Sequence, residues 1–488
     1  MSKLISVTIW ILLLVDCPFA QQLPPAISVP TGSEEFVVVN APVVVLKHIR
    51  IIDGTGSAAA DDQSIVIADG IIRAIQPSAS ATEPVSARVL DLSGHTAIPG
   101  LVGMHEHLFY IAPTGHGHLP GEPRLFTEMA FSFPRLYLAA GVTTIRTAGS
   151  IEPYTDLNVK RNIDLGYSPG PKIHLTSPFL EGEGSNRLQV HILKGQEDTA
   201  RFVNYWADEG FTSFKAYVNI SKDDLRTAIE TAHARGLKVT GHLCTIGFRE
   251  AASLGIDNLE HGLYSDSEFL PDKQPNKCPS TYGSSRTMLG IDPDTQPITD
   301  MIRDLVQHQV AITSTLVVRE VGIPNHALID QRTRDVLSPV SLMDYLLTHA
   351  QAALHPEPVA ELVATEMKFE RAFVKAGGLL MAGLDPTATN GAAVAGFGDQ
   401  REVELLVEAG FTPLEAIHIA TQNGAKFLGE HQRIGTLEVG KQADIVVIRG
   451  DPSKDIKDIE NVELVFKDGK GYDSRKLIDS VRGLVGLR

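Results

Sequence analysis

The central part of the chain, about 97–432, alternates short apolar segments with amphipathic ones, and this alternation constrains the fold more than any other feature. Strands that alternate with helices form βαβ units and a parallel sheet. Eight apolar segments have strand character, the number that closes a (β/α)8 TIM barrel. They are Ala97–His105, Val142–Arg146, Lys172–Thr176, Thr212–Ala216, Lys238–His242, Ile256–Glu260, Val310–Ser314 and Leu379–Gly383. We therefore predict an α/β protein whose largest domain, 97–432, is a TIM barrel.

Two of the intervening helices have clear capping signals. Ser221 precedes an apolar face at helical spacing, and Asp224 follows three residues later, as in a capping box. A second helix is predicted after Thr412, with Pro413 in its first turn and Glu415 at the capping-box position. These signals support the helical part of the alternation.

Short β segments flank the predicted barrel on both sides. In the first part they are separated by turn dipeptides such as Asp69-Gly70, and in the last part by Asp468-Gly469. Because the two β-rich pieces enclose the barrel, we predict that residues 42–96 and 433–488 form one small β-sandwich domain.

The first residues differ from the rest of the chain. Lys3 is followed by an apolar run at 4–15 and then by small residues, which is the order of a secretory signal peptide. We predict a signal peptide at 1–20, a flexible lead-in at 21–41, and export to the periplasm or the medium. Two alternatives are a lipoprotein that uses Cys17, which the preceding acidic residue disfavours, and an ordinary apolar N-terminal helix.

Composition restricts the partners of the protein. The chain has 43 basic and 59 acidic residues, a formal net charge of −16, and such a surface repels the phosphate backbone of nucleic acids. No later stretch is long and apolar enough to span a membrane. We expect a small-molecule substrate and a homo-oligomer, for which the aromatic segment 131–138 is either core or subunit contact.

Five of the predicted strands end in side chains that can bind a metal ion. The carboxyl ends of barrel strands surround the active site, and imidazole and carboxylate are typical zinc ligands. Each such residue alone is more often a buried or paired group than a ligand, but together and in this order they favour a metal site. The candidate ligands are His105, His107, Lys215, His242, His261 and Asp385.

This arrangement resembles the amidohydrolase superfamily, over a range from about Val43 to Lys470. The closest subgroup is that of the imidazolonepropionase-like and prolidase-like dipeptidases, which also includes ochratoxin-hydrolysing enzymes. Imidazolonepropionase itself lacks the lysine, so its specific reaction is not expected. The matching motifs are Ile98-Pro99-Gly100-Leu101-Val102, His105-Glu106-His107, Lys215-Ala216-Tyr217, Gly241-His242, Glu260-His261-Gly262, Gly383-Leu384-Asp385 and the run from Gly435 to Asp444.

The resemblance implies a binuclear site with two divalent ions, of which zinc is expected. In the binuclear members the lysine is carboxylated by CO2 and bridges both metals, and a bridging hydroxide attacks the amide. Asp385 is then both a ligand and the group that passes a proton to the leaving amine. Carried over to this chain, His105, His107 and Asp385 hold one metal, His242 and His261 hold the other, and carboxylated Lys215 joins them.

Two further residues are candidates for substrate contacts. Tyr217 lies on the same strand face as Lys215 and could donate to the developing oxyanion, or simply pack at the barrel mouth. Arg146 could hold a substrate carboxylate, or form a structural ion pair. The loop around Pro178–Gln189 has no counterpart in the family pattern.

Cys244 and Cys278 remain after removal of the predicted signal peptide, an even pair in an oxidising compartment. They could form a disulfide that holds the loop after the sixth strand, or remain a buried thiol and a free one. The sequence leaves both possibilities open.

We predict an exported, metal-dependent amidohydrolase that cleaves a dipeptide or an N-acyl amino acid. One alternative within the same chemistry is hydrolysis of a cyclic amide, lactam or lactone. The alternative from another class is a catalytically inactive barrel that acts as a binding protein.

Overall fold

The structure is a computed structural model, and the residues that it describes are 32–81, 83–111, 126–185, 187, 189–282, 290–320, 322–323, 326, 330–354, 358–387 and 393–486. The predicted signal peptide (1–20) lies outside these residues, as does most of the predicted lead-in. Within the described ranges no helix combines the length and the apolar character needed to cross a membrane.

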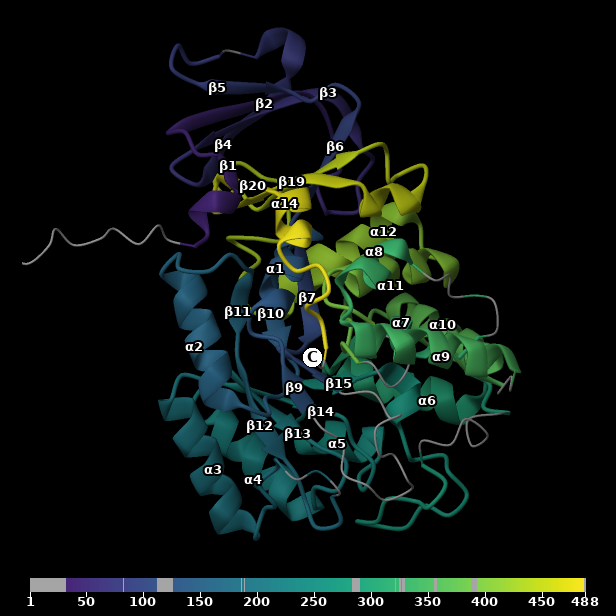
Figure 1. Ribbon diagram of the computed structural model, residues 1–488. Coiled ribbons are helices and arrows are strands. Elements are labelled where there is room, and N and C mark those ends of the chain that lie inside the picture. The colour runs from purple at the N-terminus through teal and green to yellow at the C-terminus, as the bar shows by residue number, and fades with distance from the viewer. Residues whose placement is uncertain are drawn as a thin grey trace, which may run out of the picture.

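Strands from both ends of the chain form one nine-stranded sheet, which lies at one end of the molecule (Figure 1). The hydrogen-bonded order is β1-β20-β19-β18-β6-β2-β3-β4, with β5 beside β2. The separation into two sheets that defines a sandwich stays a prediction. The strands are β1 (Val37–Val39), β2 (Val43–Ile51), β3 (Ala60–Ala68), β4 (Ile71–Pro77), β5 (Arg88–Asp91), β6 (His95–Pro99), β18 (Ile445–Arg449), β19 (Val462–Lys467) and β20 (Lys470–Asp473).

The two β-rich segments share an apolar core. Val44 of β2, Ile65 of β3, Ile445 of β18 and Phe466 of β19 are fully buried in one cluster. Antiparallel pairing of β18 with β6 joins the C-terminal strands to the N-terminal ones. This shared core explains why both ends of the chain have the same pattern.

The central part of the chain is a TIM-barrel-type α/β fold. Its strands form two runs, β11-β10-β7 and β12-β13-β14-β15-β16-β17, and every pairing within them is parallel. The backbone N–H groups of Leu384 and Asp385 donate to the carbonyl of His105 at 3.2 and 2.8 Å, which joins the end of the last strand to the first. The strands are β7 (Leu101–Glu106), β10 (Val142–Thr147), β11 (Lys172–His174), β12 (Thr176–Leu180), β13 (Ser213–Ala216), β14 (Lys238–Gly241), β15 (Asn258–Glu260), β16 (Ala311–Ser314) and β17 (Leu380–Ala382).

Two predicted strands are interrupted in the structure. The segment predicted as Ala97–His105 divides at Gly100 into β6 of the nine-stranded sheet and β7 of the barrel. A Cβ atom on Gly100 would overlap the side chain of Thr143, so only glycine fits where the chain passes between the two sheets. The third strand is likewise divided, at Leu175, into β11 and β12.

Helices flank the barrel strands, with α2 to α4 on one side of Figure 1 and α6 to α11 on the other. The predicted caps are present, because the hydroxyls of Ser221 and Thr412 accept from the amides of Asp224 and Glu415. The helices are α1 (Ser132–Ala139), α2 (Pro153–Asp164), α3 (Gln196–Asp208), α4 (Lys222–His233), α5 (Phe248–Leu254), α6 (Gln296–Gln307), α7 (Val317–Glu320), α8 (Gln331–Val336), α9 (Pro339–Leu354), α10 (Val359–Lys375), α11 (Phe397–Glu408), α12 (Pro413–His418), α13 (Gly424–Phe427) and α14 (Ser474–Asp479).

Candidate metal centre

Two histidines and an aspartate meet where the first and last barrel strands end. His105 is part of β7 and His107 follows it, whereas Asp385 lies just beyond β17. Nε2 of His107 lies 3.3 Å from Oδ1 of Asp385, and Nε2 of His105 lies 3.6 Å from the same oxygen. The three residues each offer a ligand atom within 4.8 Å of the others, close enough for one ion.

The other two predicted histidines lie beside this group. His261 follows β15, and its Nε2 lies 4.0 Å from Oδ2 of Asp385. The ring centroid of His261 is 4.4 Å from that of His105 and 4.6 Å from that of His242, which follows β14. All four predicted histidines therefore gather around one end of the barrel with Asp385.

The backbone is strained at two of these positions. Asp385 has φ of 53° and His261 has φ of 65°, in the left-handed region that non-glycine residues rarely adopt. Such a conformation costs roughly 1 kcal/mol or more, and it persists where the surrounding structure enforces it, often at a functional site. At both positions the strand has just ended, and the turn of the backbone brings the side chain toward the other ligands.

Three of the histidines are held through their second ring nitrogen. Nδ1 of His105 contacts Oε2 of Glu260 at 2.8 Å, and Nδ1 of His261 contacts Oγ1 of Thr315 at 2.7 Å. Nδ1 of His107 donates to the carbonyl oxygen of Gly149 at 3.1 Å. Fixing one ring nitrogen in this way directs the other, Nε2, as a lone-pair donor toward the centre.

Lys215, the remaining candidate for the metal site, is buried at the end of β13. Its side chain is 1% exposed, and its Nζ makes no hydrogen bond. The nearest carboxylate oxygen, Oε1 of Glu260, is 3.8 Å away. Burial lowers the pKa of the Lys215 amine to about 8, against the opposing attraction of Glu260. A buried amine without a hydrogen bond is costly, and so requires an explanation.

The electrostatics of the site suit cation binding. Burial lowers the pKa of His105 to about 4, and burial also places the pKa values of His242 and His261 well below the usual value. Burial would raise the pKa of Asp385, but the neighbouring imidazoles, His105 first, hold it well below its usual value. Neutral imidazoles around an ionised carboxylate are in the protonation states that a metal requires.

Arg146 is enclosed in the barrel, where its guanidinium is paired. Its side chain is 1% exposed and donates to Oε1 of Glu260 and Oδ1 of Asn258, each at 2.7 Å, and to the carbonyl of Met104. These contacts give the buried guanidinium acceptors for its N–H groups, which the burial of an arginine requires. The structural ion pair, which was the other interpretation, describes this residue.

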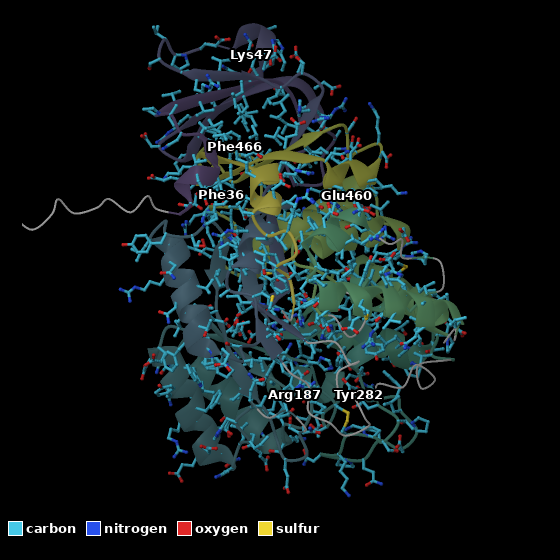
Figure 2. All side chains as sticks on the ribbon, viewed as in Figure 1. Phe36, Lys47, Arg187, Tyr282, Glu460 and Phe466 are labelled. Carbon is cyan, nitrogen blue, oxygen red and sulfur yellow. A yellow bond between two sulfur atoms is a disulfide. The ribbon has the colours of Figure 1, made fainter. Side chains whose placement is uncertain are left out.

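Tyr217 lies beside the histidines, with its ring centroid 5.3 Å from that of His242. Its hydroxyl oxygen accepts a hydrogen bond from the guanidinium of Arg187 at 2.8 Å, and the Arg187 Cζ stands 4.5 Å from the centroid of the Tyr217 ring. Figure 2 shows Arg187 on the side of the barrel away from the nine-stranded sheet. Sequence reasoning missed Arg187 because it lies in the loop without a counterpart in the family pattern.

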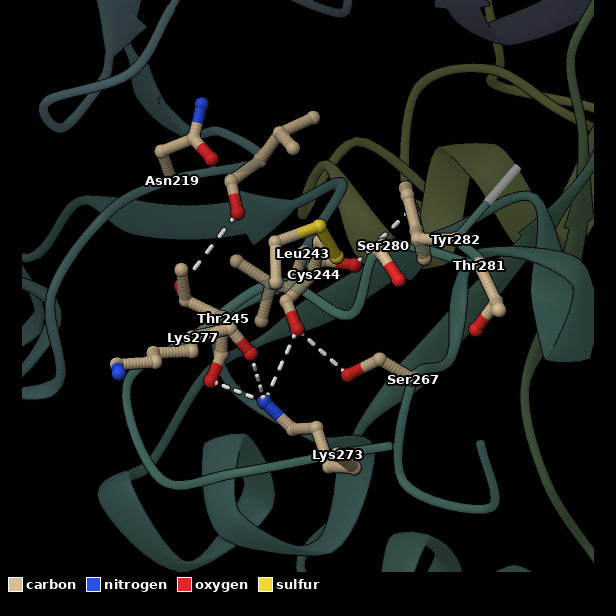
Figure 3. Close-up of a disulfide and its surroundings, with 12 residues drawn as sticks. Asn219, Leu243, Cys244, Thr245, Ser267, Lys273, Lys277, Ser280, Thr281 and Tyr282 are labelled. Carbon is tan, nitrogen blue, oxygen red and sulfur yellow. Dashed lines mark hydrogen bonds between the residues drawn. A yellow bond between two sulfur atoms is a disulfide. The ribbon is translucent and has the colours of Figure 1, made fainter. Parts of the chain in front are cut away.

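Cys244 and Cys278 form a disulfide directly beyond His242 (Figure 3). The carbonyl of Cys244 also accepts from the Ser267 hydroxyl at 2.6 Å and from the Lys273 Nζ at 3.1 Å. The disulfide and these bonds fasten the loop that follows β15 to the backbone that carries His242.

Comparison with known proteins agrees with this geometry. The sequence profile of the Amidohydrolase family matches residues 96–471. An uncharacterized protein of Mycobacterium tuberculosis is 27% identical over 197 residues, which cover 37% of this chain and 49% of that protein. The chain thus spans about half the length of the curated relatives that it matches.

Solved structures share the fold. An Xaa-Pro dipeptidase with bound methionine is 19% identical with a TM-score of 0.64, covering 88% of this chain and 100% of its own. The ochratoxinase of A. niger is 18% identical with a TM-score of 0.62, covering 91% and 100%. A bottromycin amidohydrolase is 19% identical with a TM-score of 0.66, covering 93% and 92%.

Proposed function

The chain belongs to the amidohydrolase family, and from this premise we propose that it hydrolyses the amide bond of a dipeptide or an N-acyl amino acid with two divalent metal ions, zinc being the proposed species. One observation carries the proposal. The Nε2 atoms of three histidines face a single carboxylate, Asp385, beside the buried amine of Lys215 that has no hydrogen-bond partner.

The residues fit such a pair of ions. His105, His107 and Asp385 would hold one ion, and His242 and His261 would hold the other. Lys215 would join them after its neutral amine adds to CO2, which forms an N–C bond, releases a proton and converts the amine into an anionic carbamate. The low pKa of Lys215 and its lack of a hydrogen-bond partner support this step. When bound, the ions supply an activated water and polarise the substrate carbonyl.

The side chains of the chain itself orient the site and move the proton. Glu260 and Thr315 fix the rings of His105 and His261, so that those ligands need no reorientation. Asp385 accepts a proton from the attacking water at its carboxylate and returns it to the nitrogen of the leaving amine. This transfer completes the hydrolysis to an acid and an amine.

Tyr217 and Arg187 are the proposed contacts for the substrate oxygen. Tyr217 is half-buried beside His242, where its hydroxyl can donate to the oxygen that gains charge when the carbonyl is attacked. Arg187 adds positive charge next to that hydroxyl. The pair would thereby stabilise the transition state more than the substrate.

Export to an oxidising compartment is part of the proposal. The Cys244–Cys278 disulfide supports it, because disulfides persist in oxidising compartments and are rare in the cytosol.

The test combines metal analysis with one substitution. The zinc-loaded protein should hold about two ions per chain and hydrolyse members of a panel of dipeptides and N-acyl amino acids. Lys215→Ala should lower kcat/KM by at least about 100-fold, and the surface variant Lys222→Ala should not. Less than one bound ion together with no hydrolysis would refute the function. Full activity of Lys215→Ala would refute the bridging role alone.

A further inference from the structure

A cavity opens beside His261 at the carboxyl ends of β15 and β16. It measures about 600 Å³ including its open mouth, and it is formed by His261, Tyr264, Thr315, Leu316, Arg319, Val359, Leu362, Val363 and Glu366. Four of these residues lie on one face of α10 at positions i, i+3, i+4 and i+7. Because His261 is a wall of the cavity, whatever fills the cavity lies next to the candidate metal centre.

The inner surface of the cavity is mostly apolar. Leu316, Leu362 and Val363 are 3%, 6% and 4% exposed, and Val359 is half-buried at the start of α10. These aliphatic side chains provide the surface that a hydrocarbon group would bury.

The polar groups of the inner wall already have partners. Oγ1 of Thr315 contacts Nδ1 of His261, and Glu366 accepts hydrogen bonds from the amides of Leu263 and Tyr264 at 3.0 and 2.9 Å. An apolar group can therefore enter without leaving these polar atoms unsatisfied, which removes the usual cost of burying polar walls.

The remaining two residues are partly exposed. The guanidinium carbon of Arg319 stands 3.4 Å from the centroid of the Tyr264 ring. Of the described residues that line the cavity, Arg319 is the one with a permanent positive charge. The cavity thus combines apolar walls with a cation, and the carboxylate among its lining residues, Glu366, already accepts hydrogen bonds from two backbone amides.

We propose that this cavity is the specificity subsite for an apolar side chain on one of the two groups that flank the scissile amide. The substrates are then dipeptides or N-acyl amino acids in which that group is branched aliphatic or aromatic, and substrates with only glycine there leave the cavity unfilled. The inference rests on the proposed amide hydrolysis and adds the substrate class.

The first experiment fills the cavity. Val359→Phe places a ring at its edge, and Ala364→Phe adds the same ring on the exposed face of α10 as the matched control. For each protein, kcat/KM is measured with Gly-Gly, Leu-Gly and Gly-Leu, so that each position of leucine is compared with glycine. The ratio of kcat/KM between two of these dipeptides, measured on one preparation, is independent of the fraction of active protein.

For one of the two positions, leucine should raise kcat/KM over glycine by at least about 10-fold in the unmodified protein and in Ala364→Phe. Val359→Phe should remove most of that preference. Absence of a leucine preference at both positions would overturn the subsite, as would a preference that Val359→Phe leaves unchanged.

The second measurement needs no hydrolysis. Calorimetry on the metal-loaded protein compares 4-methylpentanoate with acetate, which share the carboxylate and differ in the apolar group. The longer acid should bind at least about 10-fold more tightly, and this ratio should fall in Val359→Phe but not in Ala364→Phe. If no amide is hydrolysed and the ratio behaves as expected, the proposed function fails and the apolar subsite stands. Equal affinities for both acids would overturn the subsite.

Discussion

Among single residues, Glu260 connects more of the site than its place in the sequence indicates. One oxygen accepts from His105, 155 residues away in sequence, and the other from Arg146, 114 residues away. The metal-ligand candidates could be predicted because each lies at or just beyond the end of a strand, and strand ends meet in a barrel. The contacts of Glu260 and Arg187 could not, because they depend on which side chains face each other after the barrel forms.

The first prediction removes the charge of Glu260 while keeping its shape. Glu260→Gln leaves the buried Arg146 guanidinium without its counter-charge, so the free energy of unfolding should fall by about 3 to 5 kcal/mol. His105 also loses its charged acceptor, and zinc affinity should fall about 10- to 100-fold. Denaturant titration and competition with a chelator measure the two effects.

The control for this variant is Glu463→Gln. Glu463 also pairs with a histidine, His95, and with Arg449, but it lies at the surface. Its loss should cost less than about 1 kcal/mol. Similar losses for the two variants would mean that Glu260 has no special role.

The second prediction concerns the hydroxyl of Tyr217. Tyr217→Phe keeps the ring beside His242 and removes the proposed donor to the substrate oxygen. We expect kcat/KM to fall about 100- to 1,000-fold while the metal content is unchanged. Tyr205→Phe, at an exposed tyrosine, should have no effect. Unchanged activity of Tyr217→Phe would favour the other interpretation, packing at the barrel mouth.

At the level of secondary-structure elements, turn dipeptides in the sequence were sufficient to predict turns between strands that are neighbours in the chain. The Asp69-Gly70 and Asp468-Gly469 turns have positive φ at both residues, as hairpins between β3 and β4 and between β19 and β20 require. The division at Gly100 was not predicted, because the apolar run continues across it. It depends on the side chain of Thr143, which belongs to another strand.

The third prediction concerns the start of α5 and the pH dependence of stability. Oδ1 of Asp266 accepts from the amides of Phe248 and Glu268 at 3.1 and 3.0 Å, and burial raises the Asp266 pKa to about 7. Because the folded pKa exceeds the unfolded value of 3.8, the folded protein binds the extra proton between these values. The resulting stability is complete below pH 4 and is lost as the pH rises through 7.

Asp266→Asn keeps an acceptor oxygen and removes the titration. Between pH 5 and pH 7 the unmodified protein should lose about 2 kcal/mol of unfolding free energy relative to this variant. The pKa of Asp272, exposed in the same loop, is lowered by its hydrogen bonds to Thr281 and Ser280, so Asp272→Asn should leave this window unchanged. A constant difference between the unmodified protein and Asp266→Asn across the window would contradict the assignment.

In the whole molecule, β6 of the nine-stranded sheet leads into β7 of the barrel, and the group of His105, His107 and Asp385 lies where the first and last barrel strands end. His105 comes from β7, whereas Asp385 follows β17, and backbone hydrogen bonds join the two strand ends. The family and the barrel-type fold were predicted from the sequence and are confirmed. The joining of nine strands from both ends of the chain into one hydrogen-bonded sheet was not, because strand pairing across about 350 residues has no local signal.

Because one metal would join residues from both ends of the barrel, metal binding should stabilise the whole fold. A ligand that binds only the folded protein stabilises it by about 2.7 kcal/mol at 100 times its dissociation constant. Zinc should therefore raise the melting temperature of the metal-free protein, and bicarbonate should raise it further, since a carbamate on Lys215 adds a shared ligand. Lys215→Met serves as the comparison, because it replaces the buried amine with an apolar side chain of similar length that cannot form a carbamate. Its own melting temperature can differ from that of the unmodified protein, so the shifts on adding zinc and then bicarbonate are compared instead of absolute values.

The bicarbonate shift should vanish in Lys215→Met while a smaller zinc shift remains. Equal bicarbonate shifts in both proteins would exclude the carbamate and leave the histidines and Asp385 as the complete ligand set.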